Sequence, residues 1–395
     1  MILKILLLDS AFSAMPIHNY LLGLGHEVWT VGNRELDALA IAYPDRWLRG
    51  DYSDVTFVGD LVERHQFDRV VPGCTDVSMD VFVRLGLQPD YPYTLEKNQA
   101  INRKPLFRQL CAELNLPAPH CVSADAVPQN GRFICKPADS FSGRGVTIFD
   151  GSNPEAKIYA LNMARQHSPT NEVVVEEFVV GELHSFTAFI ESGRVATAFI
   201  VREGSRNDPF AVDTSYVRRD YNAEKMKTIQ NAVEKLCERL QLCDGLLHTQ
   251  FIDAGDHVAI LEMTRRCPGD LYAMLISYST GYNYAGYYAA YFIGARPSQS
   301  EPHTRHVLRH TIKQSGSPGF GGFELTDDQT NGLFSLIPVE RLGQPLDPRN
   351  AMRTGIAFLE MPDADTLEER YHTIIGSKAR EADVHENIVD ADFPM

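Results

Sequence analysis

The sequence predicts an α/β N-terminal domain with a parallel, doubly wound sheet, followed by α+β segments that contain antiparallel hairpins. The chain opens as strand, helix and strand over residues 2–8, 16–24 and 27–31, and this alternation is typical of parallel sheets. Residues 132–149 read instead as two apolar strands around a loop rich in Gly and Ser, which is the pattern of a hairpin. We therefore expect two different kinds of sheet in one chain.

The N-terminal pattern continues with a helix over residues 55–65, a strand over residues 69–72 and a polar turn. Open α/β sheets bind ligands at the carboxyl ends of their strands, so Gly73, Thr75 and Asp76 form either part of a ligand pocket or only a turn. A dinucleotide site would need Gly-x-Gly-x-x-Gly after the first strand, whereas residues 9–14 contain no glycine. We expect a Rossmann-like domain that does not bind NAD.

Composition limits the classes of partner. A chain of 395 residues with 44% apolar and 23% charged residues predicts two or three globular domains. The net charge of −15 argues against nucleic acid and anionic membranes as partners. The seven cysteines are scattered without a C-x-x-C pair, so neither disulfides nor a zinc knuckle are expected. Residues 1–8 are too short for a signal peptide or a membrane span. We expect a protein of the reducing cytoplasm.

The loop of the predicted hairpin has the residue types that bind a nucleoside triphosphate. Glycines let backbone N–H groups approach phosphate oxygens, serines donate hydrogen bonds, and a lysine at the strand end supplies positive charge. These residues are Lys136, Ser140, Ser142, Gly143, Arg144 and Gly145. In a Walker loop the lysine follows the glycines and a helix comes next. A Walker loop is therefore excluded here, because Lys136 precedes the glycines and a strand follows them. We expect ATP here, although any strand-turn-strand unit can contain Ser and Gly.

Other motifs stand in a fixed order around this loop. Asn-Arg-Lys at residues 102–104 precedes an amphipathic stretch, Val-Val-Val-Glu-Glu-Phe-Val-Val-Gly-Glu follows at residues 173–182, and Glu-Met-Thr-Arg-Arg comes at residues 262–266. In this order the chain resembles the ATP-grasp superfamily, whose members include D-alanyl-D-alanine ligase, biotin carboxylase and the carbamoyl-phosphate synthetase large chain. The resemblance covers roughly residues 95–295.

This resemblance implies a two-lobed ATP-grasp fold after the Rossmann-like domain. We expect the N-terminal domain at residues 1–98, a small lobe at 99–172, a large lobe at 173–296 and a small C-terminal β-rich subdomain at 297–395. Higher Pro, Gly and Ser content after residue 296 indicates a linker there. Within the large lobe, residues 246–252 and 258–263 read as neighbouring strands.

The resemblance also implies roles in binding ATP. In the family, the hinge between the lobes receives the adenine, so the backbone near Glu177 to Val179 would pair with the ring edge while Phe178 or Val179 packs on its face. Glu176 would take the exocyclic amine. The ribose contact falls to Glu182, in a register shifted from the family pattern. The ammonium groups of Lys104 and Lys136 would contact the phosphates.

Magnesium binding is where the sequence departs from the family. Members usually offer two carboxylates and an asparagine, whereas the matching positions here are Gln250, Glu262 and Thr264. Amide and hydroxyl oxygens still ligate Mg²⁺, so we expect a site with weaker affinity or with one ion fewer. Arg266 matches the arginine that ends the family's Glu-x-Asn-x-Arg pattern and would face the transferred phosphate. Arg266 and Lys136 are therefore the candidate catalytic residues.

The expected activity is that of an ATP-dependent carboxylate-amine ligase. Such an enzyme converts a small-molecule carboxylate to an acyl phosphate and joins it to an amine, releasing ADP and phosphate. Two alternatives stay open: a bicarbonate-dependent carboxylase or carbamoyl-phosphate-type enzyme, and a non-catalytic ATP-binding sensor. The sequence does not identify the two substrates, and it leaves a homodimer open.

Overall fold

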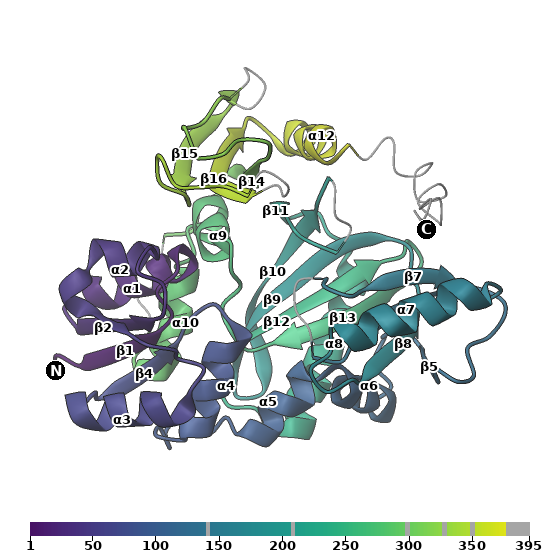
Figure 1. The fold of residues 1–395 in the computed structure, drawn as a ribbon, viewed down its shortest axis with the longest axis horizontal. Coiled ribbons are helices and arrows are strands. Elements are labelled where there is room, and N and C mark those ends of the chain that lie inside the picture. The colour runs from purple at the N-terminus through teal and green to yellow at the C-terminus, as the bar shows by residue number, and fades with distance from the viewer. Residues whose placement is uncertain (140–142, 207–209, 297–300, 326–329, 348–351, 377–395) are drawn as a thin grey trace.

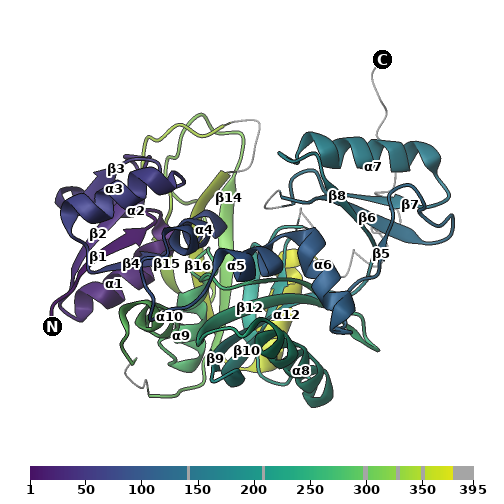
Figure 2. The same cartoon turned by 90° about the horizontal axis from the view of Figure 1, so that it is seen from below.

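The computed structural model describes residues 1–139, 143–206, 210–296, 301–325, 330–347 and 352–376. Within these residues the strands form a four-stranded parallel sheet, a second four-stranded sheet and an eight-stranded sheet. The parallel sheet and the smaller antiparallel sheet lie at opposite ends of the molecule, with the eight-stranded sheet between them (Figures 1 and 2). The expected combination of α/β and α+β architecture is confirmed.

The N-terminal domain is built on strands in the order β3-β2-β1-β4, all parallel. These strands are β1 (Lys4–Leu8), β2 (Glu27–Gly32), β3 (Trp47–Arg49) and β4 (Arg69–Pro72). The α-helices are α1 (Met15–Gly23), α2 (Ala38–Ala42), α3 (Val55–His65) and α4 (Asp76–Leu85), with short 3-10 turns at Phe12–Ala14 and Pro44–Arg46. The apolar strand β1 is central, and its side chains from Ile5 to Leu8 are fully buried. The predicted strand-helix-strand opening is confirmed.

Two helices lead into the small lobe, which has a sheet in the order β5-β8-β6-β7 with all pairs antiparallel. Its elements are α5 (Leu95–Asn102), α6 (Lys104–Glu113), β5 (Cys121–Val122), β6 (Arg132–Pro137), β7 (Thr147–Asp150), α7 (Pro154–Gln166) and β8 (Val173–Glu177). The register between Arg132 and Asp150 confirms the predicted hairpin. Helix α7 packs Ala160 and Ala164 into a core with Phe133. The expected boundary between the two lobes, at residues 172 and 173, would assign β8 to the large lobe. In the structure β8 is hydrogen-bonded to β5 and β6 of the small lobe.

The large sheet has the order β13-β12-β9-β10-β11-β14-β16-β15. Its strands are β9 (Glu182–Glu191), β10 (Arg194–Gly204), β11 (Thr214–Arg218), β12 (Gly245–Asp253), β13 (Val258–Thr264), β14 (His306–Gln314), β15 (Leu333–Pro338) and β16 (Met352–Met361), accompanied by α8 (Ala223–Leu240) and α12 (Ala364–Ile375). Strand β14 pairs with β11. The C-terminal strands therefore extend the sheet of the large lobe, with α12 beside them (Figure 1).

The long apolar stretch after β13 forms two helices, α9 (Tyr272–Thr280) and α10 (Tyr284–Ile293). Helix α10 packs against α1 and β4 of the N-terminal domain, and the Tyr288 hydroxyl donates to the Pro72 carbonyl at 3.1 Å. One hydrophobic core joins this domain to the large sheet. The two units are therefore held in a fixed relation.

All seven cysteines are free thiols, as expected. None of the helices in the described ranges has both the length and the hydropathy needed to cross a bilayer.

Candidate functional site

Charged residues of the N-terminal domain, the small lobe and the large sheet interact where these three units meet. Lys104 is the first residue of α6 and is mostly shielded from water. Burial lowers its pKa, and the charge of Glu262 opposes that effect. Lys136, Asp76 and Glu176 also act on Lys104 electrostatically. Residues far apart in the sequence therefore share one electrostatic environment, as the motif order implied.

Lys136 is held by a buried carboxylate on the neighbouring strand. Its Nζ lies 2.8 Å from Glu176 Oε2, while Arg108 Nε donates to Glu176 Oε1 at 2.7 Å. Glu176 is 1% exposed. Burial favours the neutral acid, but the charges of Lys136 and Arg108 outweigh burial and lower the pKa of Glu176. Glu176 is therefore ionised, and it fixes the position of the Lys136 side chain. The sequence analysis missed Arg108, because an arginine on an amphipathic helix has no distinctive pattern.

The glycine loop follows Lys136 and returns to β7. Gly143 and Gly145 have φ angles of +71° and +74°, a region that side chains other than glycine rarely adopt. A Cβ at Gly143 would lie 2.7 Å from the Cβ of Phe210. Arg144 between them is exposed. The loop therefore needs glycine both for its conformation and for its contact with the segment after β10. The predicted residues Ser140 and Ser142 lie outside the described residues.

Some backbone N–H groups of the predicted hinge after β8 already donate to other residues. The Glu177 N–H donates to His120 and the Phe178 N–H donates to Arg132, both at 2.9 Å, whereas the Val179 N–H has no backbone partner in the described part of the chain. The Arg132 guanidinium lies 4.8 Å from the centre of the Phe178 ring. Val179 is therefore the hinge residue with a backbone donor to offer a ligand.

Glu182, predicted to contact the ribose, is at the start of β9 and about half exposed. Its carboxylate forms an ion pair with Arg202, and Arg218 Nη1 lies 3.7 Å from the same oxygen. The ribose role stays a prediction.

The expected cation ligands lie on the hairpin of β12 and β13. Gln250 is directly opposite Glu262 in the register, and the Glu262 side chain is exposed. The Thr264 hydroxyl donates to Asp76 Oδ1 at 3.3 Å. Gln250 Nε2 donates to Glu203 Oε2 at 2.7 Å. Two of the three expected ligands thus lie side by side, while the Thr264 hydroxyl is turned toward the N-terminal domain.

Glu203 is a carboxylate that the sequence analysis missed. It lies at the end of β10 and is 4% exposed, and its Oε1 accepts a hydrogen bond from Ser185 Oγ at 2.7 Å. Burial raises its pKa to about 7, although the bonds from Ser185 and Gln250 oppose the rise. Within the described residues it has no ion-pair partner. In the sequence Glu203 follows Arg202 at the end of an apolar run, and nothing in the sequence shows that β10 brings it to Gln250.

Arg266 reaches across to the N-terminal domain. Its Nε and Nη2 donate to the two carboxylate oxygens of Asp76 at 2.8 and 3.2 Å. Burial disfavours the charge, but Asp76 outweighs burial and raises the pKa of Arg266. Arg265 points to the other face and is fully buried, where its Nη2 donates to the Tyr91 hydroxyl at 3.0 Å. His248, opposite Thr264, is buried, and burial lowers its pKa to about 3, so it is neutral.

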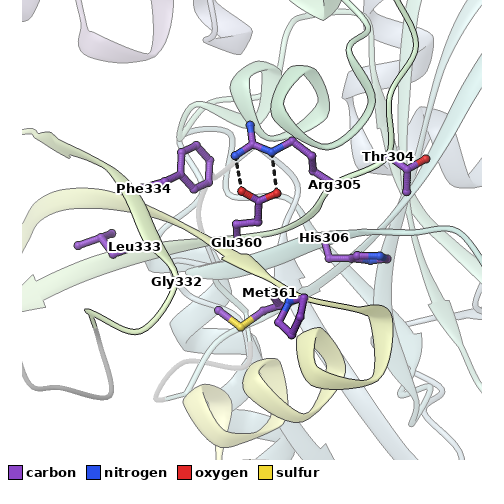
Figure 3. Close-up of a pocket in the computed structure, with 9 residues that line it drawn as sticks. Thr304, Arg305, His306, Gly332, Leu333, Phe334, Glu360 and Met361 are labelled. Carbon is purple, nitrogen blue, oxygen red and sulfur yellow. Dashed lines mark hydrogen bonds and ion pairs between the residues drawn. The ribbon is translucent and has the colours of Figure 1, made fainter.

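A separate hollow of about 550 Å³ lies on the C-terminal strands, lined by Thr304, Arg305, His306, Gly332, Leu333, Phe334, Glu360, Met361 and Pro362. Figure 3 shows that Arg305 and Glu360 pair with each other, through bonds of 2.8 and 2.6 Å. Since its charges satisfy one another and none of its residues belongs to the cluster above, the hollow is not part of the candidate site.

The donors at the junction suit a nucleoside triphosphate with a hard cation. Lys104, Lys136 and Arg266 supply positive charge, and Glu262 with Gln250 supplies oxygen atoms of the kind that Mg²⁺ prefers. The described residues contain no group of three or more His, Cys, Asp or Glu side chains suited to a metal. An ion there would therefore depend on the Gln250 amide and on phosphate oxygens in addition to Glu262.

Comparisons with known proteins agree with these features. Residues 101–269 match the model of the ATP-grasp domain family. The formate-dependent phosphoribosylglycinamide formyltransferase of Mycobacteroides abscessus is 24% identical over 336 residues, which cover 78% of this chain and 79% of that protein.

Two solved structures share the fold over nearly their whole length. The L-amino acid ligase from Bacillus licheniformis has a TM-score of 0.73 at 18% identity, covering 94% of this chain and 96% of its own. The biotin carboxylase domain dimer of the Hydrogenobacter thermophilus 2-oxoglutarate carboxylase, in complex with MgADP, ADP and bicarbonate, has a TM-score of 0.73 at 12% identity, covering 95% and 90%. The motif order and the fold agree with the family match, and residues 101–269 form an ATP-grasp domain.

Proposed function

We propose that this protein is an ATP-dependent ligase that activates a carboxylate as an acyl phosphate and joins it to an amine, releasing ADP and phosphate. The observation that supports this most directly is the common electrostatic environment of Lys104, Lys136 and Glu262 at the junction of the lobes. Phosphoryl transfer depends mainly on positioning and on neutralising charge, and this cluster provides fixed charges of both signs. Among the similar proteins, the L-amino acid ligase has a name that fits this reaction.

The hinge would bind the adenine through backbone groups. The Val179 N–H and the Glu177 carbonyl would pair with the ring edge, and Phe178 or Val179 would cover its face. Glu176 was expected to accept the exocyclic amine, but its two oxygens already accept from Arg108 and Lys136. We therefore assign Glu176 the role of holding Lys136. Glu182 would contact the ribose once its pairing with Arg202 rearranges.

The phosphates would lie between the glycine loop and the cationic side chains. Backbone N–H groups near Gly143 and Gly145 would donate to phosphate oxygens, assisted by Ser140, Ser142 and Arg144. Lys104 and Lys136 would neutralise the charge that shifts to ADP as the bond breaks. A Mg²⁺ ion held by Glu262, Gln250 and the phosphates would add Lewis acidity at the transferred group. Thr264 would join this set only after leaving Asp76.

The residues predict two chemical steps. A substrate carboxylate oxygen attacks the γ-phosphorus, the bond to the bridging oxygen breaks, and ADP leaves with its electron pair. Arg266, oriented by Asp76, would hold the oxygens of the acyl phosphate in its planar fork. The amine nitrogen then attacks the acyl carbon, phosphate leaves, and the nitrogen loses a proton. The scheme needs no covalent enzyme intermediate.

A nucleotide-binding sensor without turnover is the second candidate. The observation that favours it is the presence of Gln250 and Thr264 at two of the three expected cation positions, which leaves Glu262 as the only carboxylate there. A bicarbonate-dependent enzyme stays within the same chemistry, because bicarbonate would replace the organic carboxylate.

The test is an ADP-release screen of the purified protein with MgATP. Small carboxylates, including formate and bicarbonate, are combined in pairs with amino acids and other amines, and ATP binding is measured separately. The ligase predicts ADP release that requires both partners. Turnover with bicarbonate in place of an organic acid would indicate the carboxylase, and ATP binding without turnover by any pair would indicate the sensor.

A further inference from the structure

The cation site contains a second carboxylate, one hydrogen bond away from the expected ligands. Glu203 is 47 residues before Gln250 in the sequence, yet its Oε2 lies 2.7 Å from Gln250 Nε2. The register explains the approach. Gln250 is opposite Glu262 on one side and Ser185 on the other, and Ser185 pairs with Val201. Because side chains two residues apart share a face of a strand, Glu203 lies on the same face as this row.

The hydrogen bond sets the orientation of the Gln250 amide. A carboxylate only accepts hydrogen bonds, so the NH₂ end of Gln250 must face Glu203. The carbonyl oxygen is on the opposite side of the amide carbon and therefore points away from β10. Strand β13, which carries Glu262, lies on the other side of β12 from β10. An amide whose NH₂ end is held by Glu203 can therefore present its oxygen to a cation beside Glu262.

Glu203 is itself firmly held. Ser185 Oγ donates to its Oε1, and the Tyr272 hydroxyl lies 2.8 Å from Ser185 Oγ. The Tyr371 hydroxyl donates to the Glu203 backbone carbonyl at 2.8 Å. These hydrogen bonds fix the position of the Glu203 side chain and backbone.

We propose that Glu203 is a positioning residue of the cation site, which turns the Gln250 carbonyl oxygen toward the metal. This inference rests on the proposed function, because it needs a cation between Gln250, Glu262 and the phosphates. It explains how a neutral amide at one of the ligand positions is held in an orientation that suits a cation. Groups that orient metal ligands typically change metal affinity about 10- to 100-fold when they are replaced.

The experiment measures Mn²⁺ binding to the full-length protein with saturating ADP, by electron paramagnetic resonance or calorimetry, so that no turnover is needed. Glu203→Gln keeps the shape of the side chain but removes its charge. The new amide can donate as well as accept hydrogen bonds, so it no longer forces the NH₂ end of Gln250 to face position 203. We expect Mn²⁺ affinity to fall about 10- to 100-fold, while ADP binding without metal and the melting temperature stay close to wild type. The matched control is Glu234→Gln on α8, because Glu234 Oε1 also accepts from a glutamine, Gln230, at 3.1 Å.

The double variant Glu203→Gln with Gln250→Glu exchanges the acid and the amide. If Glu203 acts through Gln250, the exchange restores Mn²⁺ affinity lost in the single variant. Unchanged affinity in Glu203→Gln, or an exchange that restores nothing, would overturn the inference. If Glu203→Gln does not fold, Mn²⁺ affinity is measured for Glu203→Asp, whose shorter side chain keeps the carboxylate but moves it away from Gln250. Wild-type Mn²⁺ affinity of Glu203→Asp would also overturn the inference. If the wild-type protein binds ADP but does not bind Mn²⁺, or binds neither of them, the proposed function itself is contradicted.

Discussion

Two buried glutamates, one in each lobe, differ in how the protein treats their charge. Glu176 in the small lobe is 1% exposed and Glu203 in the large sheet is 4% exposed. Glu176 is paired with Arg108 and Lys136, which lower its pKa despite burial. The Glu203 carboxylate accepts hydrogen bonds from Ser185 and Gln250, and burial raises its pKa to about 7 although these bonds and the charge of Arg309 oppose the rise. Similar burial therefore shifts the two pKa values in opposite directions, because two ion pairs hold Glu176, whereas Glu203 forms no ion pair within the described residues.

The difference suggests different roles. The negative charge of Glu176 is paired with Arg108 and Lys136, and these contacts fix the position of Lys136. Glu203 forms no ion pair within the described residues, which suits a site whose positive charge arrives with a ligand. Buried charges that lose a partner destabilise a fold strongly. Removing the cation partner of Glu176 should therefore lower the free energy of unfolding, whereas removing the charge of Glu203 should leave stability close to wild type.

The largest effect is expected from Arg108→Met. This change leaves Glu176 buried with Lys136 as its remaining cation, and breaking a buried ion pair costs about 3–5 kcal/mol. Unfolding in denaturant should show a loss of that size in the free energy of unfolding. Arg239→Met is the control, because Arg239 and Glu113 form an exposed pair at 3.7 Å, for which a loss of about 0–1 kcal/mol is expected. Equal losses in the two variants would mean that the Glu176 triad is not the special case described here.

The next effect concerns activity. Lys136→Ala should lower kcat by about 10²–10³, the usual cost of one preorganised electrostatic partner. The measurement is ADP release with the substrate pair found in the screen, and Lys235→Ala, an exposed lysine on α8, should behave as wild type. Near-normal turnover by a folded Lys136→Ala protein would refute the phosphate role of the hairpin.

A third buried carboxylate, Asp9, extends the comparison. It accepts backbone N–H groups of Ala11 and Cys74 at 2.9 and 3.1 Å, yet burial raises its pKa from 3.8 to about 6. Between these values the unfolded chain ionises first, so stability falls as pH rises from about 4 to 6 and then levels off. Two pKa units correspond to about 3 kcal/mol, which is an upper limit for this effect.

Asp9→Asn removes the ionisation while keeping an acceptor for one N–H group. The free energy of unfolding of the variant minus that of the wild type should therefore increase between pH 4 and pH 7. Denaturant unfolding at both pH values measures it, and groups that titrate alike in both proteins cancel. A difference that does not change with pH would show that Asp9 is ionised in the folded state at little cost.

The smallest effect separates the two expected ligands of the cation. Glu262→Gln removes the carboxylate at the ligand positions, and it should raise the Mg²⁺ concentration needed for half-maximal turnover more than Gln250→Ala does, by at least about tenfold or 1.4 kcal/mol. The measurement is a Mg²⁺ titration of ADP release. Equal effects would argue that charge does not dominate the site.

Much of the fold could be predicted because it follows from local patterns. The helix predicted at residues 55–65 is α3 (Val55–His65), and the hairpin around the glycine loop is present with the expected strands. The sheet to which β8 belongs could not be predicted from the sequence, because an apolar strand has the same pattern whether it pairs with the sheet before it or with the sheet after it. The C-terminal strands were expected as a separate unit, but their pairing with β11 depends on edge hydrogen bonds that no pattern encodes.

For the candidate site, the sequence by itself determined the residue types and their order: the glycine loop after Lys136, the hinge at residues 176–179 and the single carboxylate at Glu262. Short-range geometry is sufficient for these, because alternation along strands and the needs of glycine act within a few residues. Only the tertiary structure decided the partners: Arg108 for Glu176, Asp76 for Arg266 and Glu203 for Gln250. Each pair joins segments at least 47 residues apart, and the charge state of a buried group depends on neighbours that only the packed sheets bring within hydrogen-bonding distance.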